Sequence, residues 1–260
     1  FKIDVPQNNE QSMKAVEQIF VQLYGIYDEA DWYQKWWLGY VQEEFSLELV
    51  SDGGYINYYV RSPTYYKELM QAAFYAHYQD AILTETEDYT KEMTAEMINT
   101  EKVLVWGSEL KLEREDELPI KTYPMFEHGL IGKAVDPFAN ILEFMSRLQP
   151  GEKLWYQIMI QPTDLPHLKK IAQDRIDSVV ESHPKGGEDW VDKASKIPLK
   201  ALEAAHDILI PGEFGADDHA EQAMLSKRIF LTTPEKELVE EVDKKASRWP
   251  FHTKMRFMYF

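Results

Sequence analysis

The start of the chain alternates between strand-like and helix-like patterns of apolar positions. Phe1, Ile3 and Val5 alternate with polar residues, which is the period of a half-buried strand. The apolar positions from Met13 to Tyr27 then recur at three- and four-residue steps, as in an amphipathic helix. The chain is therefore predicted to begin with a strand followed by a helix.

A hairpin, a second helix and a fourth strand are predicted next. Residues 45–50 alternate between apolar and polar, and Gly53-Gly54 supplies a tight turn into a strand over 55–60. A helix from about residue 64 to 78 precedes a strand over 81–89. This β-α-β-β-α-β order is that of a ferredoxin-like split βαβ unit, with two helices on one face of an antiparallel sheet. The alternative, two crossovers in a parallel sheet, is disfavoured by the tight hairpin.

The second half repeats a helix followed by a strand twice. Asp136-Pro137 favours a helix start, and an alternating strand follows over 154–160. Thr232 and Glu235 have the spacing of a capping box ahead of another helix, and residues 253–259 alternate as the last strand. Residues 163–231 predict helical segments separated by loops, which we interpret as an insertion.

These patterns predict an α+β chain of two ferredoxin-like units with antiparallel sheets. We expect the first unit over 1–112, a linker or long loop over 113–135, and a second unit over 136–260 with the helical insertion at about 163–231. The chain begins with Phe1 rather than Met and ends in a strand with no closing turn. We therefore expect it to be a piece of a longer polypeptide.

The composition narrows the range of functions. The 260 residues carry 28 Lys and Arg against 45 Asp and Glu, a formal net charge of −17. Binding to nucleic acid or to an anionic bilayer needs cationic side chains, so no direct high-affinity nucleic acid binding is expected. The absence of cysteine excludes disulfides, thiolate metal sites and cysteine nucleophiles. No apolar run approaches the roughly 18 residues of a membrane-spanning helix, so a soluble segment is expected.

Motifs of catalysis are missing from the sequence. It contains no phosphate-binding loop, no dinucleotide fingerprint, no H-E-x-x-H and no G-x-S-x-G. We therefore expect no cofactor, no metal and no catalytic residues. One alternative is a metal-dependent hydrolase or nuclease that uses Asp217, Asp218 and His219, although an acidic helix start explains the same cluster. Another alternative is a regulatory domain that senses a small ligand between the two units.

A tryptophan-rich stretch stands out between the first helix and the hairpin. Three of the seven Trp residues lie within residues 31–40. Trp and Tyr bury a large area at a low rotamer cost, so this stretch is interpreted as a contact surface for a partner or a membrane interface. The alternative is a long connection that folds back over the helix layer. The candidate partner-binding residues are Trp32, Tyr33, Trp36, Trp37 and Tyr40.

Several segments resemble an uncharacterised bacterial family that is common in candidate-phylum bacteria. The matching segments are Phe45–Gly54, Ile56–Val60, Tyr75–Ala81, Glu109–Leu112, Pro119–Tyr123, Glu152–Pro162 and Phe251–Tyr259. The resemblance spans most of the chain but is loose over 163–231, and the stretch from Trp32 to Tyr40 departs from it. It brings no catalytic residues, because none is established for the family.

The resemblance implies a place in a membrane-associated machine. Members of the family often carry a predicted N-terminal membrane segment and are associated with conjugation-like or type IV secretion-like systems, some with a motor ATPase region. On this basis we expect a non-catalytic scaffold or docking domain of a DNA-transfer apparatus. Its partners would be proteins of that assembly, at the cytoplasmic face of the bacterial membrane, with any membrane anchor outside these residues.

Overall fold

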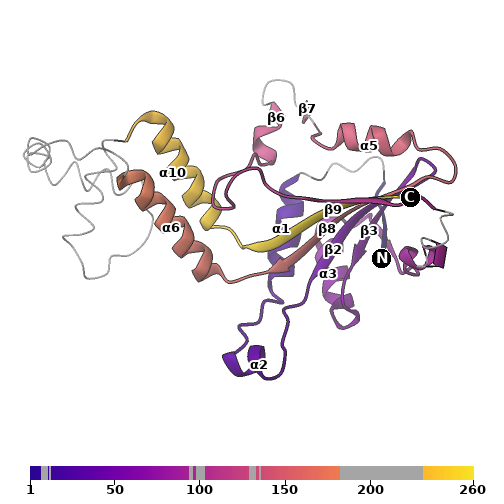
Figure 1. Cartoon of the computed structure of the whole chain (residues 1–260), viewed down its shortest axis with the longest axis horizontal. Helices are drawn as coiled ribbons and strands as arrows, with labels where there is room; N and C mark the ends of the chain where they lie inside the picture. Colours follow the sequence, from indigo (N-terminus) through magenta and orange to yellow (C-terminus); the bar gives the residue numbers. More distant parts are fainter. Residues whose placement is uncertain are drawn as a thin grey trace, which may run out of the picture. The chain divides into compact units, whose positions relative to one another are not determined.

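The computed structural model describes residues 1–6, 11, 13–93, 96–97, 103–128, 133–134, 136–181 and 231–260. They form a mixed α+β structure around a seven-stranded antiparallel sheet with the order β4-β1-β3-β2-β8-β9-β5 (Figure 1). The strands of this sheet are β1 (Lys2–Asp4), β2 (Phe45–Asp52), β3 (Tyr55–Arg61), β4 (Ile82–Thr84), β5 (Trp106–Leu110), β8 (Lys153–Pro162) and β9 (Phe251–Tyr259). The α-helices are α1 (Met13–Tyr24), α2 (Trp32–Trp36), α3 (Lys67–His77), α5 (Ala139–Ser146), α6 (Leu165–Glu181) and α10 (Thr233–Ala246). A small second sheet pairs β6 (Glu127–His128) with β7 (Lys133–Ala134), and short 3-10 turns cover Thr64–Tyr66, Tyr89–Glu92 and Tyr123–Met125.

The elements expected in the first 89 residues are confirmed in type and order. Apart from the short helix α2 between α1 and β2, which was not expected, the chain runs β1-α1-β2-β3-α3-β4. These strands lie in the order β4-β1-β3-β2 with antiparallel pairs throughout. The apolar stripes of α1 and α3 pack on one face of the sheet. Their contacts form a core that includes Leu23, Phe45, Val60, Met70 and Ala73, all buried. The helix layer predicted from the hydrophobic pattern is thus confirmed.

The opposite face of the sheet is partly covered as well. Val50, Trp155 and Phe260 are buried there against Tyr89, Met93, Val103 and Val105, which follow β4 in the chain. Ser46 and Glu48 lie on this face and are buried. In the sequence, Ser46 and Glu48 alternate with apolar residues, which is typical of a strand with one face in solvent. The pattern therefore does not predict that the segment after β4 covers this face.

The second half joins the first in one sheet. The expected division into two units, each with its own antiparallel sheet, differs from this arrangement, because the whole length of β2 pairs with β8, from Phe45–Ile160 to Asp52–Lys153. β9 and β5 extend the same sheet beyond β8. The free edge that β2 would present in an isolated four-stranded unit is thereby paired, which removes an exposed row of backbone hydrogen-bonding groups.

Two boundaries of elements also differ from expectation. The strand expected over 81–89 ends at Thr84, since Asp88 accepts a hydrogen bond from the Thr90 amide at 2.9 Å and begins the turn over Tyr89–Glu92. The expected linker over 113–135 contains the turn Tyr123–Met125 and the pair β6 and β7. Of the expected helical insertion, α6 is confirmed, and residues 182–230 lie outside the described part.

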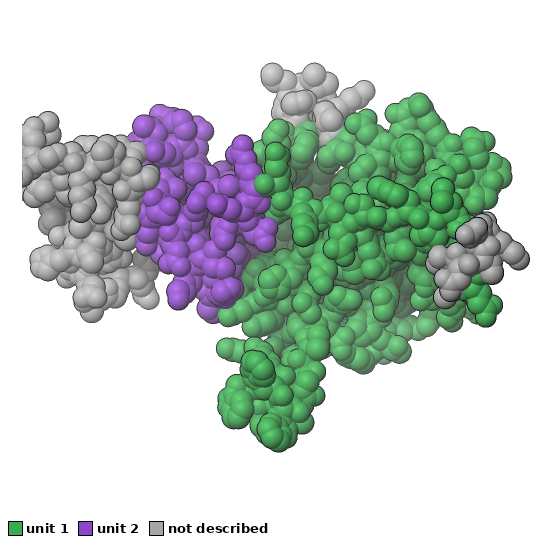
Figure 2. Space-filling view, viewed as in Figure 1, with its two compact units in different colours: residues 1–113, 120–164, 249–260 green, residues 114–119, 165–248 purple. Residues whose placement is uncertain are grey.

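The chain divides into two compact units that are coloured separately in Figure 2. Unit 1 holds residues 1–113, 120–164 and 249–260, and unit 2 holds 114–119 and 165–248. These limits differ from the expected boundaries at 112 and 136. The boundaries differ because the large sheet joins segments that are far apart in the sequence. The helices α6 and α10 are not part of that sheet and form a separate pair.

Unit 2 has a small core of its own. α6 and α10 pack through Ile176, Val180, Val239 and Val242, with Leu231 beside them. The Lys245 ammonium donates to the Leu118 carbonyl at 3.0 Å, and burial lowers the pKa of Lys245. The short segment 114–119 is thus tied to the helix pair.

Candidate functional site

The predicted tryptophan stretch forms an exposed aromatic surface in unit 1. Trp32, Trp36 and Trp37 have 72%, 84% and 76% of their area exposed. We define the aromatic surface as Trp32, Tyr33, Trp36, Trp37, Leu38 and Val41, all of which are exposed. It lies on a connection that projects from the rest of unit 1 at α2 (Figures 1 and 2). The alternative interpretation expected this stretch to fold back over the helix layer. The exposure of the three indoles disagrees with that interpretation.

Local hydrogen bonds build this projection. The Asp31 amide donates to the Gln34 side chain at 2.8 Å, and the Lys35 amide donates to the Asp31 carbonyl at 3.0 Å, so a short helix begins at Trp32. Gly39 has a positive φ of 66° and turns the chain back, where the Tyr40 amide donates to the Gln34 carbonyl at 2.9 Å. These hydrogen bonds and the positive φ of Gly39 therefore give the projection a specific backbone conformation.

At the base of the projection, the Gln42 side chain joins the two ends of the connection by hydrogen bonds. The Gln42 side chain accepts from the Asp28 amide at 3.0 Å and donates to the Ile26 carbonyl at 3.2 Å. The Gln161 side chain of β8 donates to the Gln42 carbonyl at 2.6 Å. Both ends of the connection are thus held against the sheet.

The five candidate residues do not all share the same surface. Tyr33 stacks on Trp37 with ring centroids 6.5 Å apart, and Trp32 meets Tyr33 edge-on at 6.2 Å. Tyr40 is half-buried, and burial, followed by the charge of Asp28, raises its pKa. The structure therefore brings Trp32, Tyr33 and Trp37 into ring contact, leaves Trp36 exposed on the same short helix, and assigns Tyr40 to the base.

Acidic side chains surround the aromatic surface in the sequence. Between residues 28 and 44 the chain carries five carboxylates and one cation, Lys35. The carboxylates are Asp28, Glu29, Asp31, Glu43 and Glu44. The aromatic surface accordingly lies within a stretch of the chain in which carboxylates outnumber cations.

A second feature, which sequence reasoning missed, is a row of polar side chains across the sheet. Glu48 of β2, Gln157 of β8 and Arg256 of β9 are register neighbours, and Glu48 and Gln157 are buried. The Tyr89 hydroxyl donates to Glu48 and accepts from the Gln157 amide at 2.7 Å. The Arg256 guanidinium donates to the side-chain amide oxygen of Gln157 at 2.6 Å. Each buried polar group in this row thereby has a partner.

Burial and the Glu48 carboxylate raise the pKa of Tyr89 far above that of an exposed phenol. A phenol held protonated in this way donates a hydrogen bond but does not act as a base. Trp155 and Met159, which add apolar residues to the second face of the alternating strand over 154–160, were the available signal for this site, because apolar side chains on both faces indicate a strand that is covered on both sides.

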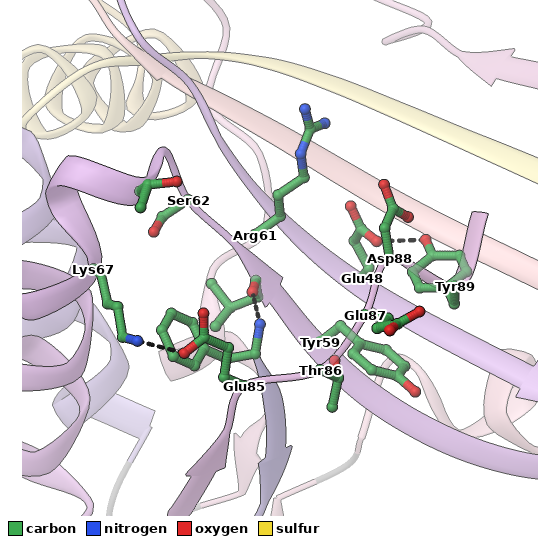
Figure 3. A pocket seen from close by; sticks show the side chains of 13 residues that line it. Glu48, Tyr59, Arg61, Ser62, Lys67, Glu85, Thr86, Glu87, Asp88 and Tyr89 are labelled. Carbon is green, nitrogen blue, oxygen red and sulfur yellow. Dashed lines mark hydrogen bonds and ion pairs between the residues drawn. The ribbon is translucent and has the colours of Figure 1, made fainter. Parts of the chain in front are cut away.

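A cavity of about 350 Å³ opens beside Glu48 and Tyr89. Figure 3 shows the Tyr89–Glu48 hydrogen bond at one end and the ion pair of Lys67 with Glu85 at the other. The remaining lining residues are Phe1, Tyr59, Val60, Arg61, Ser62, Thr64, Thr86, Glu87 and Asp88. Four carboxylates and two cationic side chains line this space, so a small molecule with hydrogen-bond donors or a positive charge would fit its chemistry.

The described residues contain no group of three or more potential metal ligands. Asp217, Asp218 and His219, the cluster of the alternative metalloenzyme, lie outside the described residues. The structure therefore offers no geometry for that alternative.

Comparisons with known proteins were made at the level of family, sequence and structure. No family model, no curated protein and no solved structure matches the chain. Among the helices of the described residues, none has the length and apolar character needed to cross a bilayer.

Proposed function

We propose that the chain is a non-catalytic docking domain whose aromatic surface binds a protein partner. The observation that carries this proposal is the exposure of Trp32, Trp36 and Trp37 on a projection held by its own hydrogen bonds. Apolar area in water is unfavourable by roughly 25 cal/mol per Å². Exposed clusters of this kind are typical of interaction sites, and Trp is enriched among the residues that dominate binding energy.

The charge around the aromatic surface defines the kind of partner. Five carboxylates and one cation in residues 28–44 fit an apolar groove whose rim carries Lys or Arg. An anionic bilayer would repel the same surface, and the whole chain adds a formal charge of −17. A protein groove with a basic rim is therefore the occupant that we propose.

The setting of the domain is also a proposal. Its resemblance to a bacterial family associated with type IV secretion-like and conjugation-like systems supports a membrane-associated assembly, at the cytoplasmic face of the membrane. We propose that residues 1–89 are a ferredoxin-like unit, which the strand order β4-β1-β3-β2 and the two helices on one face support. The described residues of 136–260 add only two strands, β8 and β9, to the seven-stranded sheet, so the proposal covers the first half.

Site-specific photo-crosslinking tests the docking proposal. Benzoylphenylalanine would replace Trp36 in one sample and Tyr55, which is 81% exposed on the hairpin of unit 1, in the matched control. A protein crosslinked from position 36 and not from position 55 would then be identified, purified and titrated against the unmodified chain by calorimetry.

The titration decides the proposal. Trp36→Ala and Trp37→Ala should each weaken binding at least tenfold, whereas Tyr55→Ala should leave it unchanged. Because both indoles are exposed, the same substitutions should change the free energy of unfolding by less than about 0.5 kcal/mol. Equal affinity of all variants would contradict docking through this surface, and binding of the wild type to phosphatidylcholine vesicles alone would point to a bilayer instead.

The cavity favours ligand sensing as a second candidate function. Its mixed lining and the buried carboxylate of Glu48 are features of a small-molecule site. A thermal-shift screen of free amino acids and polyamines tests this candidate, since a ligand that binds the folded form alone raises its melting temperature. A hit should shift the wild type and not Glu87→Gln combined with Asp88→Asn, and the absence of any shift at 10 mM, roughly the weakest affinity of interest, would count against the candidate.

A further inference from the structure

Among the residues that the structure describes, no further strand pairs with the outer edge of β5. This strand pairs with β9 from Trp106–Tyr259 to Leu110–Met255 and stands last in the strand order. All five of its residues are exposed. An uncovered edge of this kind presents backbone groups that can pair with another strand.

The pattern of the ladder shows which of these groups point outward. Lys153 and Phe260 exchange both backbone hydrogen bonds, at 3.0 and 2.9 Å, across β8 and β9. Such pairs alternate along an antiparallel ladder, so every second residue of β9 from Phe260 bonds to β8 and the others, including Phe257, bond to β5.

The same alternation applies to β5 itself. Ser108 faces Phe257, so Trp106, Ser108 and Leu110 direct their N–H and C=O groups to β9. Gly107 and Glu109 therefore direct theirs to the open edge. Two residues with outward amides and carbonyls are enough to begin a new antiparallel pairing.

The side chains along this edge are apolar at alternate positions. Leu104, Trp106, Leu110 and Leu112 are exposed by 81%, 60%, 42% and 46%. Trp106 and Leu110 share one face of the sheet because their partners Tyr259 and Met255 are four residues apart on β9. Leu104 and Leu112 continue the same period on either side of the strand.

We propose that β5 pairs with β5 of a second copy of this chain, antiparallel about a two-fold axis at Ser108. In this register Gly107 bonds to Glu109 of the second copy, and Trp106 packs against its Leu110. Leu104 and Leu112 meet in the same way if the pairing extends by two residues at each end. The edge is thus complementary to itself, as a closed two-fold interface requires.

Neighbouring registers are less favourable. A shift that places the axis at Glu109 sets two carboxylates directly opposite each other, which is destabilising. A shift that places it at Gly107 separates Trp106 from Leu110. The register about Ser108 avoids both, and each Glu109 retains Arg256 of its own β9 as register neighbour.

The expected dimer is weak and depends on salt. Five paired residues fall short of the roughly 800 Å² per partner of a standard interface, so a Kd on the order of 100 µM is expected. Each copy carries a formal charge of −17, and this repulsion is screened by salt. Association measured by sedimentation equilibrium should therefore strengthen when NaCl is raised from 0.05 to 0.5 M, roughly a threefold change in Debye length.

Disulfide trapping tests both the pairing and its register, because the chain contains no cysteine. Residues that face each other on the two-fold axis have Cα atoms about 4.5 Å apart, which suits a disulfide. Ser108→Cys should form a disulfide dimer at least tenfold faster than Tyr55→Cys, the exposed control. Faster crosslinking of Glu109→Cys than of Ser108→Cys would overturn the register, and equal rates for positions 108 and 55 would overturn the pairing.

A proline variant separates pairing from other contacts. Glu109→Pro removes an outward amide without removing a bond to β9, and edge strands tolerate proline at such positions. It should weaken the dimer at least tenfold while circular dichroism and melting temperature stay close to those of the wild type. If Glu109→Pro unfolds the chain, Trp106→Glu, which sets a charge against Leu110 of the second copy, replaces it. A dimer that persists in the folded variant would overturn the proposal.

Discussion

At the scale of single residues, the polar row of Glu48, Tyr89, Gln157 and Arg256 has the strictest requirement for hydrogen-bond partners, because Glu48 and Gln157 are buried. A carboxylate away from water needs hydrogen bonds to remain there, and the Tyr89 hydroxyl supplies one to Glu48. The row links β2, β8 and β9 with the turn that follows β4. Polar contacts therefore hold together segments from both halves of the sequence.

Removing one hydroxyl tests how much this row stabilises the fold. Tyr89→Phe leaves the ring in place and deprives both Glu48 and Gln157 of a partner. The free energy of unfolding should fall by roughly 1–3 kcal/mol, the cost of an unpaired buried polar group. Urea denaturation gives this difference, and Tyr55→Phe at the exposed hairpin should give a change close to zero. Equal effects of the two substitutions would mean that the row does not stabilise unit 1.

The tyrosines also predict how stability depends on alkaline pH. Burial raises the pKa of Tyr89, Tyr156 and Tyr78 above the ordinary value of 10.0. A raised pKa in the folded state favours the protonated phenol, so its contribution is fully present below pH 10 and is lost as the pH rises further. Stability should consequently fall above about pH 10, and Tyr89→Phe should reduce the slope of that fall. Absorbance at 295 nm follows the ionisation, and full titration of the phenols near pH 10 in the folded chain would contradict this expectation.

At the scale of elements, the hairpin between β2 and β3 depends on close contact with the end of α5. Gly54 has a φ of 89°, and a Cβ at this position would lie 2.8 Å from the Ser146 carbonyl oxygen. Gly151 has a φ of 97° but open space around its Cβ position. Glycine is needed at both places for its backbone conformation, and at Gly54 also for its size.

This pair of glycines gives a matched test. Gly151→Ala should cost roughly 1–2 kcal/mol from the left-handed backbone alone. Gly54→Ala carries the same strain and in addition displaces backbone, so it should lower the melting temperature more than Gly151→Ala. Thermal unfolding followed by circular dichroism measures both, and a larger loss for Gly151→Ala would show that the contact with α5 is unimportant.

At the scale of the whole molecule, charge is the dominant property. A formal charge of −17 opposes binding to phosphates, although the polar face of the sheet presents Arg61 and Lys254. Long-range repulsion exceeds the attraction of such a small group of cations when the ligand is a duplex. The whole chain is therefore suited to partners that are neutral or positively charged.

Binding to DNA tests this balance. At 0.15 M salt, the 260-residue chain should bind a 30-base-pair duplex no more tightly than non-specific complexes do, with a Kd of roughly 10⁻⁴ M or weaker. Fluorescence anisotropy measures the affinity, and Arg61→Ala with Lys254→Ala should not change it. Nanomolar binding would contradict both this expectation and the docking proposal in its present form.

Sequence alone determined most of the secondary structure and the α+β class. The helical period of α1 and α3, the glycine turn between β2 and β3, and the capping box at Thr232 each follow from local chemistry. These features depend on neighbours in the chain, so a single sequence contains the information. The aromatic stretch 31–40 was likewise visible as an unusual local composition.

Only the tertiary structure decided which strands share a sheet and which polar residues are buried. The alternation of apolar residues determines which face of β2 is buried. It does not determine which strand pairs with the edge of β2, because every strand offers the same backbone hydrogen-bonding groups. The structure supplies β8 as that neighbour and covers Glu48 with Tyr89, so a residue with a solvent-facing pattern becomes part of the interior. It also leaves Trp36 in water and β5 at an open edge, since both outcomes depend on what remains uncovered after the distant segments have packed.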